Sequence, residues 1–537
     1  MTMIPLRPDS LELYDTTLRE GAQRPGISLT VHDRIRMLGQ IDSLGVGFVE
    51  GGWPDATPLD REFFAQAAHV PLRSASLVAL GRVRRPGAAA ADDPQVAALR
   101  DAGTRFVTVL VTAHDLHVSQ VLRTSLDENL AMLSQTVRHL VAEGRKVIVD
   151  AEHYFDGFLR NPAYALEIVR TAAEAGARTV VLCDTNGGML PDWIGDAVST
   201  ASSIGIDLGV HCHNDSGCAV ANSLVGLGAG AVHVQGSVNG CGERAGSTDL
   251  TTLIPDLQLK YGWPVVTPEQ LNGLTHVARA IGEITAQPVA PRQPYVGESA
   301  FAHRAGPHAA AIRVNDDLYQ HVDPRSVGND MRMLISDMAG CANAQVKGAQ
   351  LGLDLTDHAI AGEVVEAVRE REAHGYSYED ADASFDLLVR RMRGELGGSP
   401  FTVVGWRVIT EQQGDDPDAE APTEAVVRLI AGGSYRVCAG EGNGPVNALD
   451  QALRRALGGV YPQVCAYELV DYRVRLLDEG HGTDAAVRVR IDTACEDVTW
   501  ATVGVGENVI EASWEALAEA FLYGLVKGHG PSTARTL

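Results

Sequence analysis

Between residues 11 and 260, short apolar runs of β-strand composition alternate with longer segments of helical composition, and the alternation occurs eight times. The strand candidates cover residues 11–15, 47–51, 75–80, 106–111, 146–152, 179–184, 206–212 and 231–236. They are rich in Val, Ile and Leu with little polar alternation, as expected for parallel strands covered on both faces. Eight strands, each followed by a helix, over roughly 250 residues predict a (β/α)8 barrel. A doubly wound open sheet is the alternative, but no glycine-rich phosphate loop follows the first strand.

Polar side chains follow the ends of the predicted strands. In a (β/α)8 barrel, chemistry is built at the carboxyl ends of the strands. Such residues follow strands one, five, six, seven and eight: Arg19 and Glu20, Glu152, Asp184 and Thr185, His211 and His213, and residues 243–247. Structure alone gives little reason for so many polar groups to gather at one rim. We therefore expect the active site at this end of the barrel.

His211 and His213 are separated by one residue at the end of the seventh predicted strand. On extended backbone, side chains two residues apart point to the same side. With one carboxylate, two imidazoles form a three-ligand metal site with open positions, which suits a metal that polarises a substrate carbonyl. Because a His-x-His pair also arises by chance in a chain with 17 histidines, its place at the rim is what makes it informative.

The chain carries 69 acidic against 44 basic residues, a formal charge of −25 at pH 7. So acidic a surface disfavours binding to nucleic acid and to anionic membranes. No apolar stretch reaches the length of a membrane span, and residues 1–10 lack the apolar core of a signal peptide. The eight cysteines form no C-x-x-C pair, which predicts reduced and mostly buried thiols. These features indicate a cytoplasmic protein.

The length of 537 residues is too great for one domain, and we expect three. Residues 1–285 are expected to form the catalytic barrel, and residues 286–398 a mainly helical subdomain that contributes to the active site. Residues 399–537 have the composition of an α+β domain. Within them, residues 401–457 and 467–525 each have the pattern of three strands followed by a helix, which predicts an internal duplication.

Several motifs resemble those of the 2-isopropylmalate synthase, homocitrate synthase and citramalate synthase superfamily. The superfamily motifs are residues 15–23 (DTTLREGAQ), 210–215 (VHCHND) and 239–246 (NGCGERAG). The likeness is greatest to the long bacterial citramalate synthases, through residues 50–54 (EGGWP), 150–157 (DAEHYFDG), 295–303 (YVGESAFAH) and 446–449 (VNAL). The resemblance covers nearly the whole chain.

The resemblance implies an acyltransferase that condenses acetyl-CoA with an α-keto acid in a metal-assisted Claisen reaction. For a citramalate synthase the keto acid is pyruvate, and hydrolysis of the thioester yields citramalate and CoA. Such enzymes serve the biosynthesis of isoleucine and other branched-chain amino acids. The family's C-terminal domain binds a feedback amino acid and helps to form a homodimer.

The resemblance also implies catalytic roles for Arg19, Glu152, His308 and Tyr319. Arg19 is placed to stabilise the alkoxide that develops on the ketone, a task suited to a fixed cation. Glu152 occupies the position of a glutamate that deprotonates the acetyl methyl group or orients the groups that do. A thioester α-proton is weakly acidic, so a positioned base is required. His308 and Tyr319 match a His and a Tyr from beyond the barrel that act in acid–base steps.

The same motifs imply metal ligands and substrate contacts. Glu20, His211 and His213 match the metal ligands, and Ser247 stands where relatives usually have a metal-site Asn. Mn²⁺ or Mg²⁺ is expected, with Zn²⁺ and Co²⁺ as alternatives. Thr185 is expected to donate to the keto-acid carboxylate, to cap a helix, or both. The residues expected to bind substrate are Arg19, Gln23, Leu80, Thr112 and Thr185.

Departures from the family pattern keep alternatives open. Ser247 is a shorter and poorer ligand than Asn. Leu80 stands where we expect Phe, and residues 109–114 lack an expected Lys. These strand ends face the expected pocket, which favours a different keto acid such as 2-oxoisovalerate or 2-oxoglutarate. A lyase or aldolase on the same barrel and a non-catalytic amino-acid sensor are further alternatives, disfavoured by the C-terminal duplication and by the retained metal ligands respectively.

Overall fold

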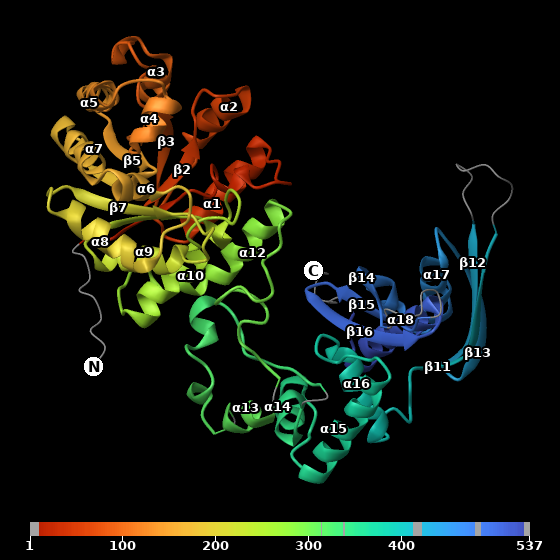
Figure 1. Cartoon of the computed structure of the whole chain (residues 1–537). Coiled ribbons are helices and arrows are strands. Elements are labelled where there is room, and N and C mark those ends of the chain that lie inside the picture. The colour runs from red at the N-terminus through yellow and green to blue at the C-terminus, as the bar shows by residue number, and fades with distance from the viewer. Residues whose placement is uncertain are drawn as a thin grey trace. The chain divides into compact units, whose positions relative to one another are not determined.

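The structure is a computed structural model that describes residues 10–304, 306–312, 314–336, 339–411, 422–477 and 485–530. The chain divides into two compact units. The first comprises Met1–Phe301 with His321–Met331, and the second comprises Ala302–Gln320 with Arg332–Leu537. Figure 1 shows the elements of both, coloured from red to blue along the sequence.

The first unit is built on a closed barrel of eight parallel strands in sequence order. The strands are β1 (Glu12–Asp15), β2 (Phe48–Gly52), β3 (Ser76–Arg82), β4 (Phe106–Thr112), β5 (Lys146–Glu152), β6 (Thr179–Asp184), β7 (Asp207–Cys212) and β8 (His233–Gly236). Strand β1 pairs in parallel with β2 on one side and with β8 on the other, where Glu12 lies opposite His233. This pairing closes the sheet, so the predicted (β/α)8 barrel is confirmed and the open sheet is excluded.

Helices surround the strands of the barrel (Figure 1). Their bounds are α1 (Val31–Ser43), α2 (Pro58–Ala67), α3 (Pro94–Asp101), α4 (Asp115–Gln120), α5 (Leu126–Ala142), α6 (Tyr154–Arg160), α7 (Pro162–Ala175), α8 (Pro191–Ser202), α9 (Ala219–Gly228), α10 (Leu250–Pro255), α11 (Pro268–Asn272) and α12 (Leu274–Ile284). Helix α1 begins at a capping box, in which the Thr30 hydroxyl accepts from the Asp33 amide (3.1 Å) and the Asp33 carboxylate accepts from the Thr30 amide (3.0 Å). Its buried residues Met37, Leu38 and Ile41 recur at helical spacing and pack against the barrel.

The barrel interior changes from apolar to polar along the strands. Tyr14, Phe48, Phe106 and Ile148 belong to one buried apolar cluster, in which the Phe48 and Phe106 rings meet edge to face at 4.9 Å. Glu50, Asp150 and Gln235 have buried polar side chains. They lie two residues beyond Phe48 on β2, Ile148 on β5 and His233 on β8. Alternate residues of a strand face the same side, so these groups form a polar layer above the apolar floor. The next positions reach the carboxyl ends of the strands.

The second unit begins with helices and ends with two sheets. The two-residue strands β9 (Ala302–His303) and β10 (Arg332–Met333) pair in parallel. The helices are α13 (Gly306–Ile312), α14 (Cys341–Leu351), α15 (His358–Ala373) and α16 (Asp382–Met392), which agrees with the helical subdomain expected here. In the described part of the chain, none of the helices is both long enough and apolar enough to cross a membrane.

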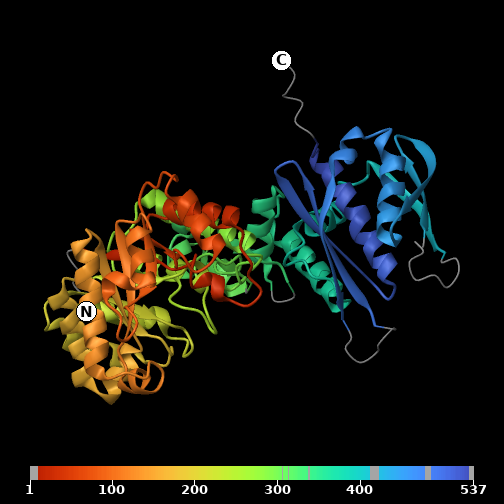
Figure 2. The same cartoon turned by 90° about the horizontal axis from the view of Figure 1, so that it is seen from above.

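The predicted duplication is present at the C-terminal end. The first copy consists of β11 (Phe401–Thr410), β12 (Thr423–Ala431), β13 (Ser434–Gly442) and α17 (Pro445–Gly458), and the second of β14 (Glu468–Leu476), β15 (Val487–Cys495), β16 (Val498–Gly506) and α18 (Val509–Lys527). Each sheet is antiparallel in sequence order (Figure 2). A register irregularity occurs at the same place in each first strand, between Val403 and Gly405 and between Leu469 and Asp471. Both helices bury apolar residues in one shared core.

The polar layer makes the stability of the barrel depend on pH. Burial, together with the charge of Glu50, raises the pKa of Asp150 to about 7. An unfolded Asp ionises near pH 4. The stability that protonated Asp150 contributes is therefore complete below about pH 4 and is lost as the pH rises to about 7. Asp150→Asn, which does not ionise, should be more stable than the wild type by about 4 kcal/mol at pH 8 and equally stable at pH 4.

Urea unfolding of both metal-free proteins across this range measures the difference. The exposed Asp192 on α8 provides the control, since Asp192→Asn should leave the pH dependence unchanged. Parallel pH profiles for wild type and Asp150→Asn would contradict the assignment.

Candidate active site

Arg19 and Glu20 lie in the turn that follows β1. The Asp15 carboxylate accepts hydrogen bonds from the Thr17 amide (2.9 Å) and hydroxyl (2.8 Å), which holds the first residues of the turn. The Thr16 hydroxyl donates to Glu20 Oε2 at 2.9 Å. Glu20 is fully buried as a result. The turn therefore presents one carboxylate and one guanidinium at the carboxyl end of the barrel.

Glu20, His211 and His213 form a compact cluster. Glu20 Oε1 lies 3.1 Å from His213 Nε2 and 3.5 Å from His211 Nε2, and the three candidate ligand atoms lie within 4.8 Å of one another. Glu20 Oε1 is buried and receives no hydrogen bond. A buried carboxylate oxygen without a donor, facing two imidazole nitrogens, fits a divalent cation. We regard the cluster as a candidate metal centre.

The protonation of the cluster suits this role. Burial raises the pKa of Glu20, but the His211 imidazole and the Arg19 guanidinium outweigh it and move the pKa well below the usual value. Burial lowers the pKa of His213 to about 4. Glu20 is therefore ionised and His213 is neutral near pH 7, which are the forms that coordinate metals.

Gln235 and Asp150 orient His211. Gln235 Nε2 donates to Asp150 Oδ1 at 3.0 Å, so its Oε1 faces His211 Nδ1 at 2.8 Å. Because an amide oxygen can only accept, His211 Nδ1 carries a proton, and in the neutral ring Nε2, which faces Glu20, is the atom available to bind a cation. A buried hydrogen-bonded chain thus fixes the tautomer of one candidate ligand, as supporting residues do in metal sites.

Arg19 is held by a carboxylate from the polar layer. Its Nε donates to Glu50, and the Tyr14 hydroxyl donates to the other Glu50 oxygen at 2.9 Å. Burial lowers the pKa of Arg19, but the charges of Glu50 and Glu20 outweigh it and raise the pKa above its usual value. Arg19 is thus a fixed cation beside the candidate metal centre.

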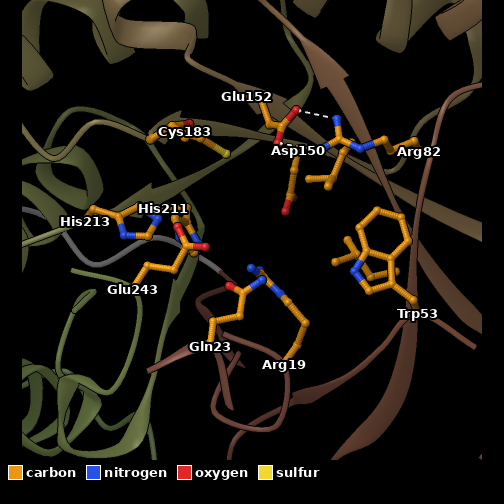
Figure 3. Close-up of a pocket in the computed structure, with 13 residues that line it drawn as sticks. Arg19, Gln23, Trp53, Arg82, Asp150, Glu152, Cys183, His211, His213 and Glu243 are labelled. Atoms are coloured by element: carbon orange, nitrogen blue, oxygen red, sulfur yellow. Dashed lines mark hydrogen bonds and ion pairs between the residues drawn. The ribbon is translucent and has the colours of Figure 1, made fainter. Parts of the chain in front are cut away.

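Arg19, Asp150, His211 and His213 line a cavity of about 190 Å³ at the carboxyl ends of the strands (Figure 3). Its lining comprises Arg19, Gln23, Trp53, Leu80, Arg82, Leu110, Asp150, Glu152, Cys183, Thr185, His211, His213 and Glu243. Of the residues expected to bind substrate, Thr112 is absent from this lining, and Glu20 and Ser247 of the expected metal site are absent as well. Strand β4 contributes Leu110 instead, and the Thr112 carbonyl accepts a hydrogen bond from Asn129 (2.8 Å).

Trp53, Arg82 and Asp150 line the cavity but were not assigned to the site from the sequence. Asp150 lies two residues before Glu152 on the same face of β5, so the period of two was the available signal. Arg82 was missed because β3 was expected to end at Leu80, whereas the strand continues to Arg82. Its guanidinium donates to both Glu152 oxygens, at 2.8 and 3.2 Å.

Two further predicted residues lie near the cluster. The Thr185 hydroxyl accepts from the His153 amide at 2.8 Å and keeps its own proton for another acceptor. It does not cap α8, whose N-cap is Leu190. Ser247 is buried, is bridged through its backbone to His213, and has its hydroxyl 3.1 Å from that of Ser237.

His308 and Tyr319 belong to the second unit. Their rings stack with centroids 4.2 Å apart. The structure thus brings the two residues together, and their part in the barrel's chemistry stays a prediction. All eight cysteines are free thiols, and Cys183, Cys212, Cys241 and Cys495 are buried.

Comparison with known proteins assigns the parts of the chain to families. Residues 10–281 match the HMGL-like family, and residues 295–375 match the family described as homocitrate synthase post-HMGL domain-like. Residues 379–525 match the LeuA allosteric (dimerisation) domain. The HMGL-like match coincides with the barrel, and the LeuA match contains both copies of the C-terminal duplication.

Relatives share this arrangement over nearly their whole length. An (R)-citramalate synthase of Streptomyces coelicolor is 53% identical over 97% of this chain and 97% of its own. One from Synechocystis is 45% identical over 96% of each chain, and a probable 2-isopropylmalate synthase of Methanopyrus kandleri is 31% identical over 95% and 97%. The resemblance drawn from the motifs is confirmed: the chain belongs to the HMGL-like enzyme family, in the group of the (R)-citramalate synthases.

Proposed function

We propose that this chain condenses acetyl-CoA with pyruvate to form citramalate and CoA. The observation that carries the proposal is that Arg19 lines one small cavity together with His211 and His213, which form the candidate metal centre with Glu20. The similarity to (R)-citramalate synthases over nearly the whole chain supports the choice of reaction.

Glu20, His211 and His213 are the residues proposed to hold a divalent cation, with Ser247 beside them. Two imidazoles and a carboxylate suit Mn²⁺, Co²⁺ or Zn²⁺, and Mg²⁺ is compatible with the carboxylate. When bound, such an ion polarises the ketone of the keto acid. The Gln235 contact keeps His211 Nε2 aimed at this position.

Three side chains of the cavity are proposed to bind the keto acid. The Thr185 hydroxyl donates to its carboxylate, because its oxygen already accepts from His153 and its proton is free. Gln23 lines the same wall and offers an amide donor. Arg19 faces the ketone oxygen, where negative charge develops during attack, and its ion pair with Glu50 fixes it there beforehand.

Glu152 is proposed to accept a proton from the acetyl methyl group. The carbon so activated forms a bond to the ketone carbon, and the ketone oxygen takes up a proton. Water then cleaves the thioester and releases the CoA thiol, which makes the sequence effectively irreversible. His308 and Tyr319 are proposed to supply acid–base groups for these later proton transfers.

The C-terminal unit is proposed to form a homodimer and to bind a feedback amino acid. The match to the LeuA allosteric (dimerisation) domain supports both. Exposed apolar residues on the sheets, among them Val404, Val437, Val470 and Leu476, fit a surface covered by a second copy.

The metal ligands can be tested without turnover. Glu20→Gln and His211→Ala should each weaken Mn²⁺ binding by more than the roughly 10–100-fold that loss of a supporting residue costs. Ser247→Ala should weaken it less, since the hydroxyl already pairs with Ser237. Electron paramagnetic resonance of free Mn²⁺ measures the affinity. The exposed His69 provides a control in His69→Ala, and equal affinities for all variants would remove the proposed centre.

The reaction is tested by release of the CoA thiol from acetyl-CoA with Mn²⁺ or Mg²⁺. Pyruvate, 2-oxoisovalerate and 2-oxoglutarate are compared as acceptors, and turnover should be fastest with pyruvate. Fastest turnover with another acid would give Leu80 and Leu110 a part in that specificity. Absence of thiol release with every acid would overturn the proposal.

Arg19→Gln should lower kcat by about 10²–10³-fold, because it removes a fixed donor at the developing oxyanion. The same thiol assay measures the loss under saturating substrates. Arg170→Gln on the outer helix α7 removes an exposed arginine and should leave kcat unchanged. Full activity of Arg19→Gln would exclude the role assigned to Arg19.

A further inference from the structure

Arg82 and Glu152 form a forked ion pair at the wall of the cavity. Arg82 Nη1 donates to Glu152 Oε2 at 2.8 Å, and Nη2 donates to Oε1 at 3.2 Å (Figure 3). Both side chains line the cavity that contains Arg19 and the two histidines. A planar guanidinium bound to both oxygens fixes the plane of a carboxylate, which a single contact does not.

The strand order explains the reach of Arg82. Arg82 ends β3 and lies opposite Leu110 of β4, while Thr112 of β4 lies opposite Glu152 of β5. The Arg82 side chain therefore spans β4 to meet Glu152. Its guanidinium carbon lies 5.9 Å from the centre of the Trp53 ring, which gives the cation a second contact.

Stability does not account for this arrangement. The Arg82 and Glu152 side chains are 44% and 22% exposed, and exposed ion pairs contribute little to folding. A carboxylate has about four lone-pair directions, and the fork occupies two of them. The position of Arg82 therefore also fixes the directions of the two lone pairs of Glu152 that stay unoccupied. The ion pair thus determines from which direction Glu152 can accept a proton.

We propose that Arg82 is a positioning residue for Glu152, which orients the carboxylate toward the acetyl methyl group. The inference rests on the proposed condensation and on Glu152 as its base. Arg82 then acts on the rate only through Glu152. Loss of the fork leaves the base present but free to rotate, and a misplaced catalytic group lowers the rate by up to about 100-fold.

The alternative is that Arg82 binds the substrate directly through an anionic group. In that case its removal raises KM for the keto acid and acts independently of Glu152. The two roles differ in how the losses of kcat from substitutions of Arg82 and Glu152 combine. If the two residues act as one unit, the free-energy effects of the two substitutions are not additive.

The test is a double-substitution cycle of wild type, Arg82→Gln, Glu152→Gln and the combined variant. Values of kcat and KM come from thiol release with the keto acid that the wild type uses best. Arg82→Gln should lower kcat about 10–100-fold with KM for the keto acid nearly unchanged. The combined variant should match Glu152→Gln alone. Glu152→Asp replaces Glu152→Gln in the cycle if the latter has no measurable turnover, since it retains a carboxylate.

Two controls separate positioning from structure. Arg82→Lys keeps the charge without the fork and should recover only part of kcat. Arg100→Gln removes another forked pair, between Arg100 and Asp101 on α3 (2.8 Å for each contact), and should leave kcat unchanged.

Multiplicative losses in the combined variant, or a raised KM with unchanged kcat in Arg82→Gln, would overturn the inference and leave the proposed reaction intact. Wild-type protein without thiol release from any keto acid would overturn the proposed reaction itself, which is measured before any variant.

Discussion

The pairing of β1 with β8 is the constraint on which the rest of the site depends. It places the turn after β1 beside the end of β7 and the loop after β8, so that Glu20 meets His211 and His213 although nearly the whole barrel sequence separates them. An open sheet would leave β1 without this neighbour. Closure of the barrel is therefore what turns a carboxylate and a His-x-His pair into one cluster.

A layer of buried polar groups supports the cluster from below. Glu50 holds Arg19, and Asp150 holds Gln235, which in turn orients His211. Burying such groups is unfavourable unless they are hydrogen-bonded, and here each acts on a residue of the site. The buried polar layer thus lowers the stability of the barrel interior, but it fixes the orientation of the Arg19 guanidinium and the His211 imidazole.

Much of this arrangement could be predicted from the sequence. The short apolar runs predicted the bounds of all eight strands to within two residues, because parallel strands that are buried on both faces are apolar throughout. The cluster followed from the rule that chemistry lies at strand ends. The contact between Arg82 and Glu152 could not be predicted. Gly81 and Arg82 lack the apolar character of the preceding residues, so the sequence did not show that β3 continues to Arg82. The absence of Thr112 from the lining could not be predicted either, because Leu110 and Thr112 face the same side of β4 and the sequence does not show which of them borders the cavity.

The charges around the cavity have a kinetic consequence. The cavity is lined by the carboxyl groups of Asp150, Glu152 and Glu243 and by the guanidinium groups of Arg19 and Arg82. The carboxylates of Glu20 and Glu50 adjoin it through His213 and Arg19, and His213 is neutral near pH 7. The cavity by itself therefore repels an anion and attracts a cation. A keto acid that arrives first meets an unfavourable field, whereas one that arrives after a divalent ion does not. A divalent cation held by Glu20, His211 and His213 would therefore reduce the negative charge that opposes entry of a keto acid.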